Sequence, residues 1–237
     1  MLYNSKFERL VDGVEFTAND PCIWVVYPPG AAGDLLASLI NFHFINTGSK
    51  YFGIADRGQV IFRPSDEKII NKKYLKGNDV LLDNQFLHDV NTELGNKNLN
   101  YGMLDQIIFS SHSFKNSHVK QIKNFFPKSK IIRLMPSDIQ EQNLAYWMGV
   151  YKNQNILTEY TTTTENFVFD KVPKHIHDYV LDINLTDIVN KTKFELTYNK
   201  IIEFLNLPYK LIRFDFIEHW ISNQHPTIKP ILQQLGN

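Results

Sequence analysis

The fold of this chain is decided by residues 22–35, which read Cys22-Ile23-Trp24-Val25-Val26-Tyr27-Pro28-Pro29-Gly30-Ala31-Ala32-Gly33-Asp34-Leu35. The part up to Tyr27 is a continuous apolar run, and such a run is typical of a strand that is covered on both faces. Pro28, Pro29 and Gly30 end the run, since prolines and glycines interrupt regular structure. An apolar-rich helical pattern then extends from Leu35 to Ile45. The negative charge of Asp34, in the first turn, interacts favourably with the positive end of the helix dipole. The stretch therefore predicts a buried strand, a tight turn and a helix.

The same alternation returns later in the chain. Apolar runs predict further strands at residues 106–111, 130–135 and 179–183, and periodic patterns predict helices at residues 118–126, from 138 to about 153, and from Thr192 to just before Pro208. Strands that alternate with helices predict an α/β fold, a doubly wound and mostly parallel sheet flanked by helices in a three-layer sandwich. We expect one domain over residues 1–237.

Residues 48–104 are expected to form an insertion on the substrate side of this domain. Residues 51–54 and 60–63 flank a polar turn and are predicted to pair as a hairpin. The Asn-, Gly- and Lys-rich stretches near 71–79 and 95–102 are predicted to be loops.

Composition excludes several classes of protein. The chain has 25 basic and 25 acidic residues, and this balance argues against a protein that coats nucleic acid through many phosphate contacts. Cys22 is the only cysteine, so there is no disulfide framework, and its apolar surroundings predict a buried side chain. The first residues lack a secretory signal, and the helical run at 35–45 is too short to span a bilayer, so we expect a cytoplasmic protein. No metal site is expected, because His175 and His177 have no third ligand in view.

The turn after the first strand is a candidate anion site. Gly30, Ala31, Ala32 and Gly33 are all small and stand directly before a helix, so the backbone can curl until successive N–H groups face one point. The alternative is a tight connection whose small residues serve strand–helix packing. If the turn is an anion site, we expect that Gly33 can be replaced by valine with loss of binding and little loss of fold.

A second candidate is His112, which follows the strand at 106–111. In a parallel sheet, ligands bind beyond the carboxyl ends of the strands, and a histidine there can act as a general base. The alternative is a structural histidine. Residues 113–133 carry basic but no acidic side chains, and they either focus an anionic substrate or form a solvated surface: Lys115, Lys120, Lys123, Lys128, Lys130 and Arg133.

With these residues in place, the chain resembles the sulfotransferases that use 3′-phosphoadenosine 5′-phosphosulfate, which share a P-loop-type fold. The family's turn Tyr-Pro-Lys-Ser-Gly-Thr-Thr is similar to residues 27–33, its Thr-His to Ser111-His112, and its strand and helix around the 3′-phosphate to residues 131–138. Pro29 stands at the place of the family's lysine. Leu134 stands at the place of its arginine, with Arg133 one residue earlier, and Gln142 at the place of its serine.

The resemblance implies a co-substrate, a base and an acceptor. It implies that the 5′-phosphosulfate is held by residues of the turn (Pro29, Gly30, Ala31, Ala32, Gly33 and Asp34), that Arg133 and Ser137 contact the 3′-phosphate, and that His112 takes the proton of a small-molecule or glycan acceptor. Two other functions remain open. One is a P-loop kinase-like phosphotransferase, although the turn lacks the GK[ST] ending of a Walker A motif. The other is a binding or structural protein without catalysis.

Overall fold

The computed structural model describes residues 14–28, 32–33, 35–37, 39–40, 51–52, 75–76, 79–80, 82–96, 106–111, 115–136, 141, 144, 178–207, 214–224 and 226–236. The strands in chain order are β1 (Ile23–Val26), β2 (Tyr51–Phe52), β3 (Leu75–Lys76), β4 (Asp79–Val80), β5 (Gln106–Ser111), β6 (Lys130–Met135) and β7 (Val180–Asn184). The labelled helices are α2 (Asn84–Asn96), α3 (Asn116–Phe125), α6 (Leu185–Val189), α7 (Lys191–Leu205), α8 (Asp215–Ser222) and α9 (Lys229–Leu235).

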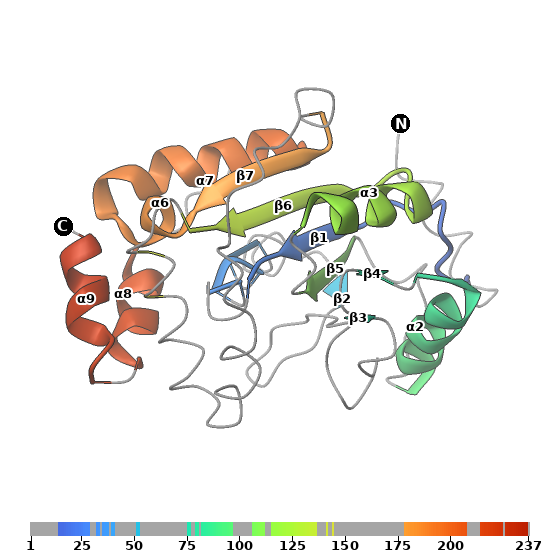
Figure 1. The fold of residues 1–237 in the computed structure, drawn as a ribbon, viewed down its shortest axis with the longest axis horizontal. Coiled ribbons are helices and arrows are strands. Elements are labelled where there is room, and N and C mark those ends of the chain that lie inside the picture. Colours follow the sequence, from blue (N-terminus) through green and yellow to red (C-terminus); the bar gives the residue numbers. More distant parts are fainter. Residues whose placement is uncertain are drawn as a thin grey trace, which may run out of the picture. The chain divides into compact units, whose positions relative to one another are not determined.

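The main sheet has the order β2-β5-β1-β6-β7, with parallel strands and flanking helices (Figure 1). The predicted α/β fold with a parallel sheet is thus confirmed. Strand β1 lies between β5 and β6, and all four of its residues are buried. The continuous apolar run at 23–26 has this cause, since a strand with a neighbour on each edge and cover on each face exposes no side chain to water.

The region between β1 and β5 differs from its prediction. Tyr51 and Phe52 form β2, which lies parallel to β5 in register with Gln106 and Ile107, while residues 60–63 of the predicted hairpin lie outside the described residues. Residues near 71–79, predicted to be a loop, contain β3, which pairs antiparallel with β4. Helix α2 was not predicted, and its last residues, Gly95 and Asn96, overlap the loop expected at 95–102.

Contacts divide the chain into two compact units. The first comprises Met1–Trp24 and Ala37–Ile131, and the second comprises Val25–Leu36 and Ile132–Asn237. No helix among the described residues is long and apolar enough to cross a membrane.

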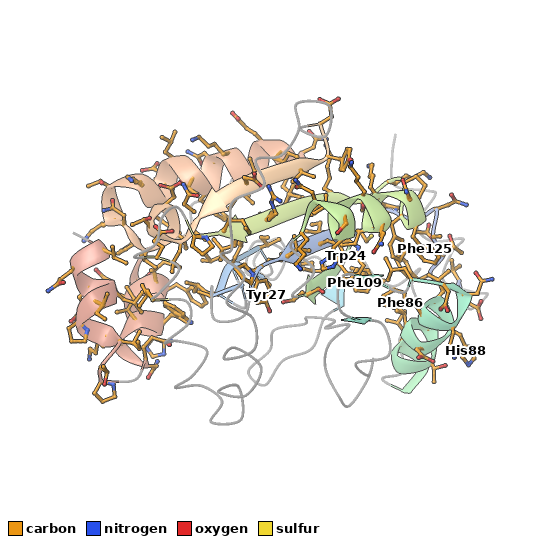
Figure 2. All side chains as sticks on the ribbon, in the orientation of Figure 1. Trp24, Tyr27, Phe86, His88, Phe109 and Phe125 are labelled. Atoms are coloured by element: carbon orange, nitrogen blue, oxygen red, sulfur yellow. The ribbon has the colours of Figure 1, made fainter. Side chains whose placement is uncertain are left out.

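The first unit is built on a cluster of buried aromatic rings. Trp24 and Phe109 stack with centroids 4.6 Å apart, and Phe86 of α2 lies 5.6 Å from Phe109 (Figure 2). Phe16 and Phe126 complete the cluster, and all five side chains are at most 1% exposed. Burying such large rings accounts for much of the stability of a unit of this size. Phe86 places α2 against this cluster, and Val90 and Leu94 of the same helix are buried as well.

Two further side chains of the first unit are informative, and one of them confirms an expectation. Cys22 is buried, as predicted, and this burial raises the pKa of its thiol. Asn91 of α2 holds the segment before β1: its Oδ1 accepts from Phe16 N at 2.8 Å, and its Nδ2 donates to Phe16 O at 2.9 Å. One amide side chain thus satisfies both backbone groups of a buried residue.

In the second unit, Asn190 joins the start of α7 to the end of α9. Its Oδ1 accepts from the backbone N of Thr192 and of Lys193, both at 3.1 Å, and so caps the start of α7. Its Nδ2 donates to the carbonyl of Leu235 at 3.2 Å, and Lys191 N donates to Gly236 O at 3.2 Å. Two carbonyls at the end of α9 are therefore bonded at the start of α7, one by the side chain of Asn190 and one by the N–H of Lys191, which satisfies groups that neither helix can pair internally.

This arrangement predicts a graded loss of stability at Asn190. We expect Asn190→Ala to lower the free energy of unfolding by about 1–2 kcal/mol, because it removes the cap of α7. Asn190→Asp keeps the acceptor oxygens and loses the bond to Leu235, so its loss is expected to be smaller. Urea unfolding followed by circular dichroism measures both. Equal losses in the two variants would show that the cap contributes nothing.

Candidate functional site

The turn after β1 contains one residue in an unusual conformation. Ala32 has φ 59°, in the left-handed region that residues with a Cβ rarely adopt. Its carbonyl accepts from Leu35 N at 3.0 Å and from Leu36 N at 3.3 Å, so Ala32 caps the helix that begins at Gly33. A left-handed residue beside helical ones is one element of an anion-binding nest, in which successive N–H groups face one point. Ala32 has this conformation, and residues 29–31 and 34 of the predicted anion site lie outside the described residues.

Gly33 is required by packing. It is buried, and a Cβ built on it would overlap ring atoms of Tyr27, the residue that follows β1. The ring of Tyr27 is itself buried, being 5% exposed, so it has little room to move aside (Figure 2 labels Tyr27). The expectation that valine could replace Gly33 with little loss of fold is therefore wrong. The packing role that we considered for the small residues applies at this position.

Arg133 lies on β6 and is 1% exposed. Its Nε donates to Asp182 Oδ1 at 2.7 Å and its Nη2 donates to Asp182 Oδ2 at 2.9 Å, which joins β6 to β7 by a bidentate ion pair. Such paired, charge-assisted bonds fix the plane of the guanidinium. Asp182 was not predicted as a site residue, because nothing in the sequence relates two positions 49 residues apart.

The residues of the basic stretch at 113–133 differ from one another in their surroundings. Leu134, at the place of the family's arginine, is fully buried, as expected for the next residue of a strand covered on both faces. Lys123 donates from Nζ to the carbonyl of Ser129 at 3.1 Å, and burial together with the neighbouring Lys130 lowers the pKa of its ammonium group. Lys120 and Lys128 are exposed. The basic stretch is thus not one surface, since Arg133 is in the interior.

Glu141 is a second buried charged side chain in this unit. It is 2% exposed, and its Oε1 accepts from Thr186 N at 3.0 Å, at the start of α6. Carboxylates favour that end of a helix, where N–H groups lack internal partners.

Several predicted site residues lie outside the described residues: Pro29, Gly30, Ala31, Asp34, His112 and Ser137. The described part of the candidate site therefore consists of Ala32, Gly33 and Arg133, all of which belong to the second unit. Among the described residues, no group of three or more His, Cys, Asp or Glu side chains could hold a metal ion.

The first unit has a groove of about 220 Å³ that sequence reasoning did not find, because it did not predict α2. One face of α2 and the segment before β1 form its walls, which consist of Glu15, Phe16, Thr17, Asn84, Leu87, His88 and Asn91. His88 is exposed there, on the face of α2 labelled in Figure 2.

Comparison with known proteins gives the following likenesses. No protein-family model matches the chain, and no curated protein does. Among solved structures, it is similar to the sulfotransferase domain of the Synechococcus PCC 7002 olefin synthase (13% identity, 94% of this chain and 96% of that one, TM-score 0.37) and to the sulfotransferase domain from the curacin biosynthetic pathway (12%, 91% and 97%, 0.36). It is also similar to a gluconokinase from Sinorhizobium meliloti 1021 (11%, 78% and 95%, 0.38). These likenesses assign no activity or ligand to the chain.

The contact between Tyr27 and Gly33 gives a stability prediction. We expect Gly33→Ala to lower the free energy of unfolding by about 1–3 kcal/mol, because overpacking forces the ring out of its place. Gly95→Ala is the matched control: Gly95 lies in α2 with nothing within 4 Å of a built Cβ, so alanine there is expected to be neutral or stabilising. Thermal and urea unfolding measure both variants. A stable Gly33→Ala would contradict the tight contact.

Proposed function

We propose that this chain binds 3′-phosphoadenosine 5′-phosphosulfate at the turn after β1 and transfers its sulfo group to a hydroxyl or amine of an acceptor. The observation that carries the proposal is the left-handed conformation of Ala32 at the start of a helix. Converging N–H groups and the positive end of a helix together favour a phosphate or sulfate. The turn also follows β1, which has neighbours on both edges, and ligands of parallel sheets bind beyond such strand ends.

In this proposal the turn binds the part of the nucleotide where the reaction occurs. The backbone of Pro29, Gly30, Ala31, Ala32, Gly33 and Asp34 surrounds the 5′-phosphosulfate. The N–H groups of residues 30–34 stabilise the charge that develops on the leaving phosphate, which is the main task of a protein in such a transfer. Gly33 contributes its N–H while its missing side chain leaves room for the ring of Tyr27.

The other residues hold the second phosphate and the proton. Arg133 and Ser137 contact the 3′-phosphate, and the charge of the guanidinium, which stays protonated at all ordinary pH values, suits a dianion. The acceptor oxygen or nitrogen forms a bond to sulfur as the bond from sulfur to the phosphate oxygen breaks. His112 takes the acceptor's proton, and adenosine 3′,5′-bisphosphate leaves.

Binding experiments on Ala32 variants test the anion site. Titration calorimetry is expected to show that the wild-type chain binds adenosine 3′,5′-bisphosphate without magnesium. Ala32→Gly is expected to bind equally well, because glycine adopts a left-handed conformation without strain. Ala32→Val is expected to bind about tenfold more weakly or worse, because a β-branched residue resists that conformation. Circular dichroism checks that both variants are folded.

The same titration separates the proposal from the kinase-like alternative. ATP with magnesium is the ligand expected of a P-loop phosphotransferase. If magnesium-dependent ATP binding is found and the bisphosphate does not bind, the sulfotransferase proposal is wrong. Binding of neither nucleotide favours a protein without this chemistry.

His112 gives a separate kinetic prediction. We expect His112→Ala to leave the affinity for the bisphosphate nearly unchanged and to lower the rate of sulfo transfer about 10²–10⁴-fold, the usual contribution of a general base. The measurement is transfer of labelled sulfo groups to a panel of hydroxyl and amine acceptors. A lowered melting temperature with an unchanged rate per folded molecule would assign His112 a structural role.

A further inference from the structure

The ion pair between Arg133 and Asp182 joins two side chains with very different exposure. Arg133 is 1% exposed and Asp182 is 40% exposed. The two bonds, at 2.7 and 2.9 Å, use Nε and Nη2 of the guanidinium and both carboxylate oxygens. One edge of the arginine fork is thus filled by a carboxylate that belongs to the protein itself.

Arginine binds a phosphate through the same fork with which it binds a carboxylate, because both groups present two oxygens at matching spacing. A phosphate that takes the Nε and Nη2 edge of Arg133 must therefore displace Asp182, and the bidentate bond to the carboxylate is lost. A phosphate that lies near Arg133 without displacing Asp182 is brought beside a like charge. Both cases weaken the binding of the phosphate.

We propose that Asp182 competes with the 3′-phosphate of the nucleotide for Arg133 and so lowers the preference of the site for a 3′-phosphorylated nucleotide. This inference rests on the proposed function, because it takes Arg133 as the contact of the 3′-phosphate. Asp182 touches no reacting atom, so it acts through Arg133. The competition moderates how tightly the product, adenosine 3′,5′-bisphosphate, is retained.

The test compares two probes that differ only in the 3′-phosphate, adenosine 3′,5′-bisphosphate and adenosine 5′-monophosphate. In Asp182→Asn, which keeps the shape of the side chain and removes its charge, the ratio of the two affinities is expected to rise about tenfold in favour of the bisphosphate. The affinity for the monophosphate is expected to stay unchanged. Titration calorimetry on the full chain measures both.

The matched control is Asp187→Asn. Asp187 lies on α6 in the same unit and pairs with Lys193 at 3.5 Å, so the variant loses the same charge without altering Arg133. Its ratio of affinities is expected to equal that of the wild type. An equal rise in both variants would assign the effect to net charge and would overturn the inference.

The other outcomes are also decisive. An unchanged ratio in Asp182→Asn overturns the inference while the proposed function stands, and a lowered ratio overturns it by making Asp182 a support for Arg133. If the wild type binds neither nucleotide, the proposed function fails and the inference fails with it.

If Asp182→Asn does not fold, Asp182→Thr replaces it. Position 182 lies on β7 and is 40% exposed, where threonine suits a strand, and the variant removes the carboxylate while keeping Arg133. The ratio of the two affinities is again expected to rise in favour of the bisphosphate, and an unchanged ratio overturns the inference.

Discussion

Burial of β1 on both faces is the constraint on which the surrounding structure depends. A strand with no exposed side chain needs a neighbour on each edge, and β5 and β6 fill these places. It also needs apolar cover, which Trp24 receives from Phe86, Phe109 and Phe126 in the first unit. Directly after the strand, the buried ring of Tyr27 lies against Gly33, where the next helix begins.

The strands beside β1 could be predicted from the sequence because buried strands leave a strong local signal. Residues 106–111 and 130–135 are apolar runs with clear ends, and β5 and β6 have these same bounds. Helix α2 leaves a weaker signal. Its buried residues Phe86, Val90 and Leu94 follow helical spacing, but Gly95 and Asn96 at its end resemble the start of a loop. Here the packing of Phe86 outweighs local preference.

The chain's last helices were missed for a different reason. Helices α8 and α9 have 8 and 7 residues, too few for a periodic pattern to be distinguished. Pro230 reads as a break, yet it lies in the first turn of α9, where the missing N–H of proline has no cost. The position of a proline within a helix, rather than its presence, decides its effect.

The candidate site was predictable only where its residues are neighbours in the sequence. The small residues at 30–33 predict a tight turn, and Ala32 adopts a left-handed backbone conformation there. The partner of Arg133 was beyond reach, because a bond between β6 and β7 depends on which strands lie side by side. Tyr27 was missed as the partner of Gly33 since a sequence does not say which way a ring turns.

The bonds at Asn190 affect how the second unit is completed during synthesis. The carbonyls of Leu235 and Gly236, which meet the start of α7, belong to residues made more than a whole helix later than Asn190. On the ribosome, α7 can form early, because Asn190 caps the N–H groups of Thr192 and Lys193 without help from α9. The N–H of Lys191 must be bonded by water until Gly236 has been made, so the joint between α7 and α9 is completed later than the cap.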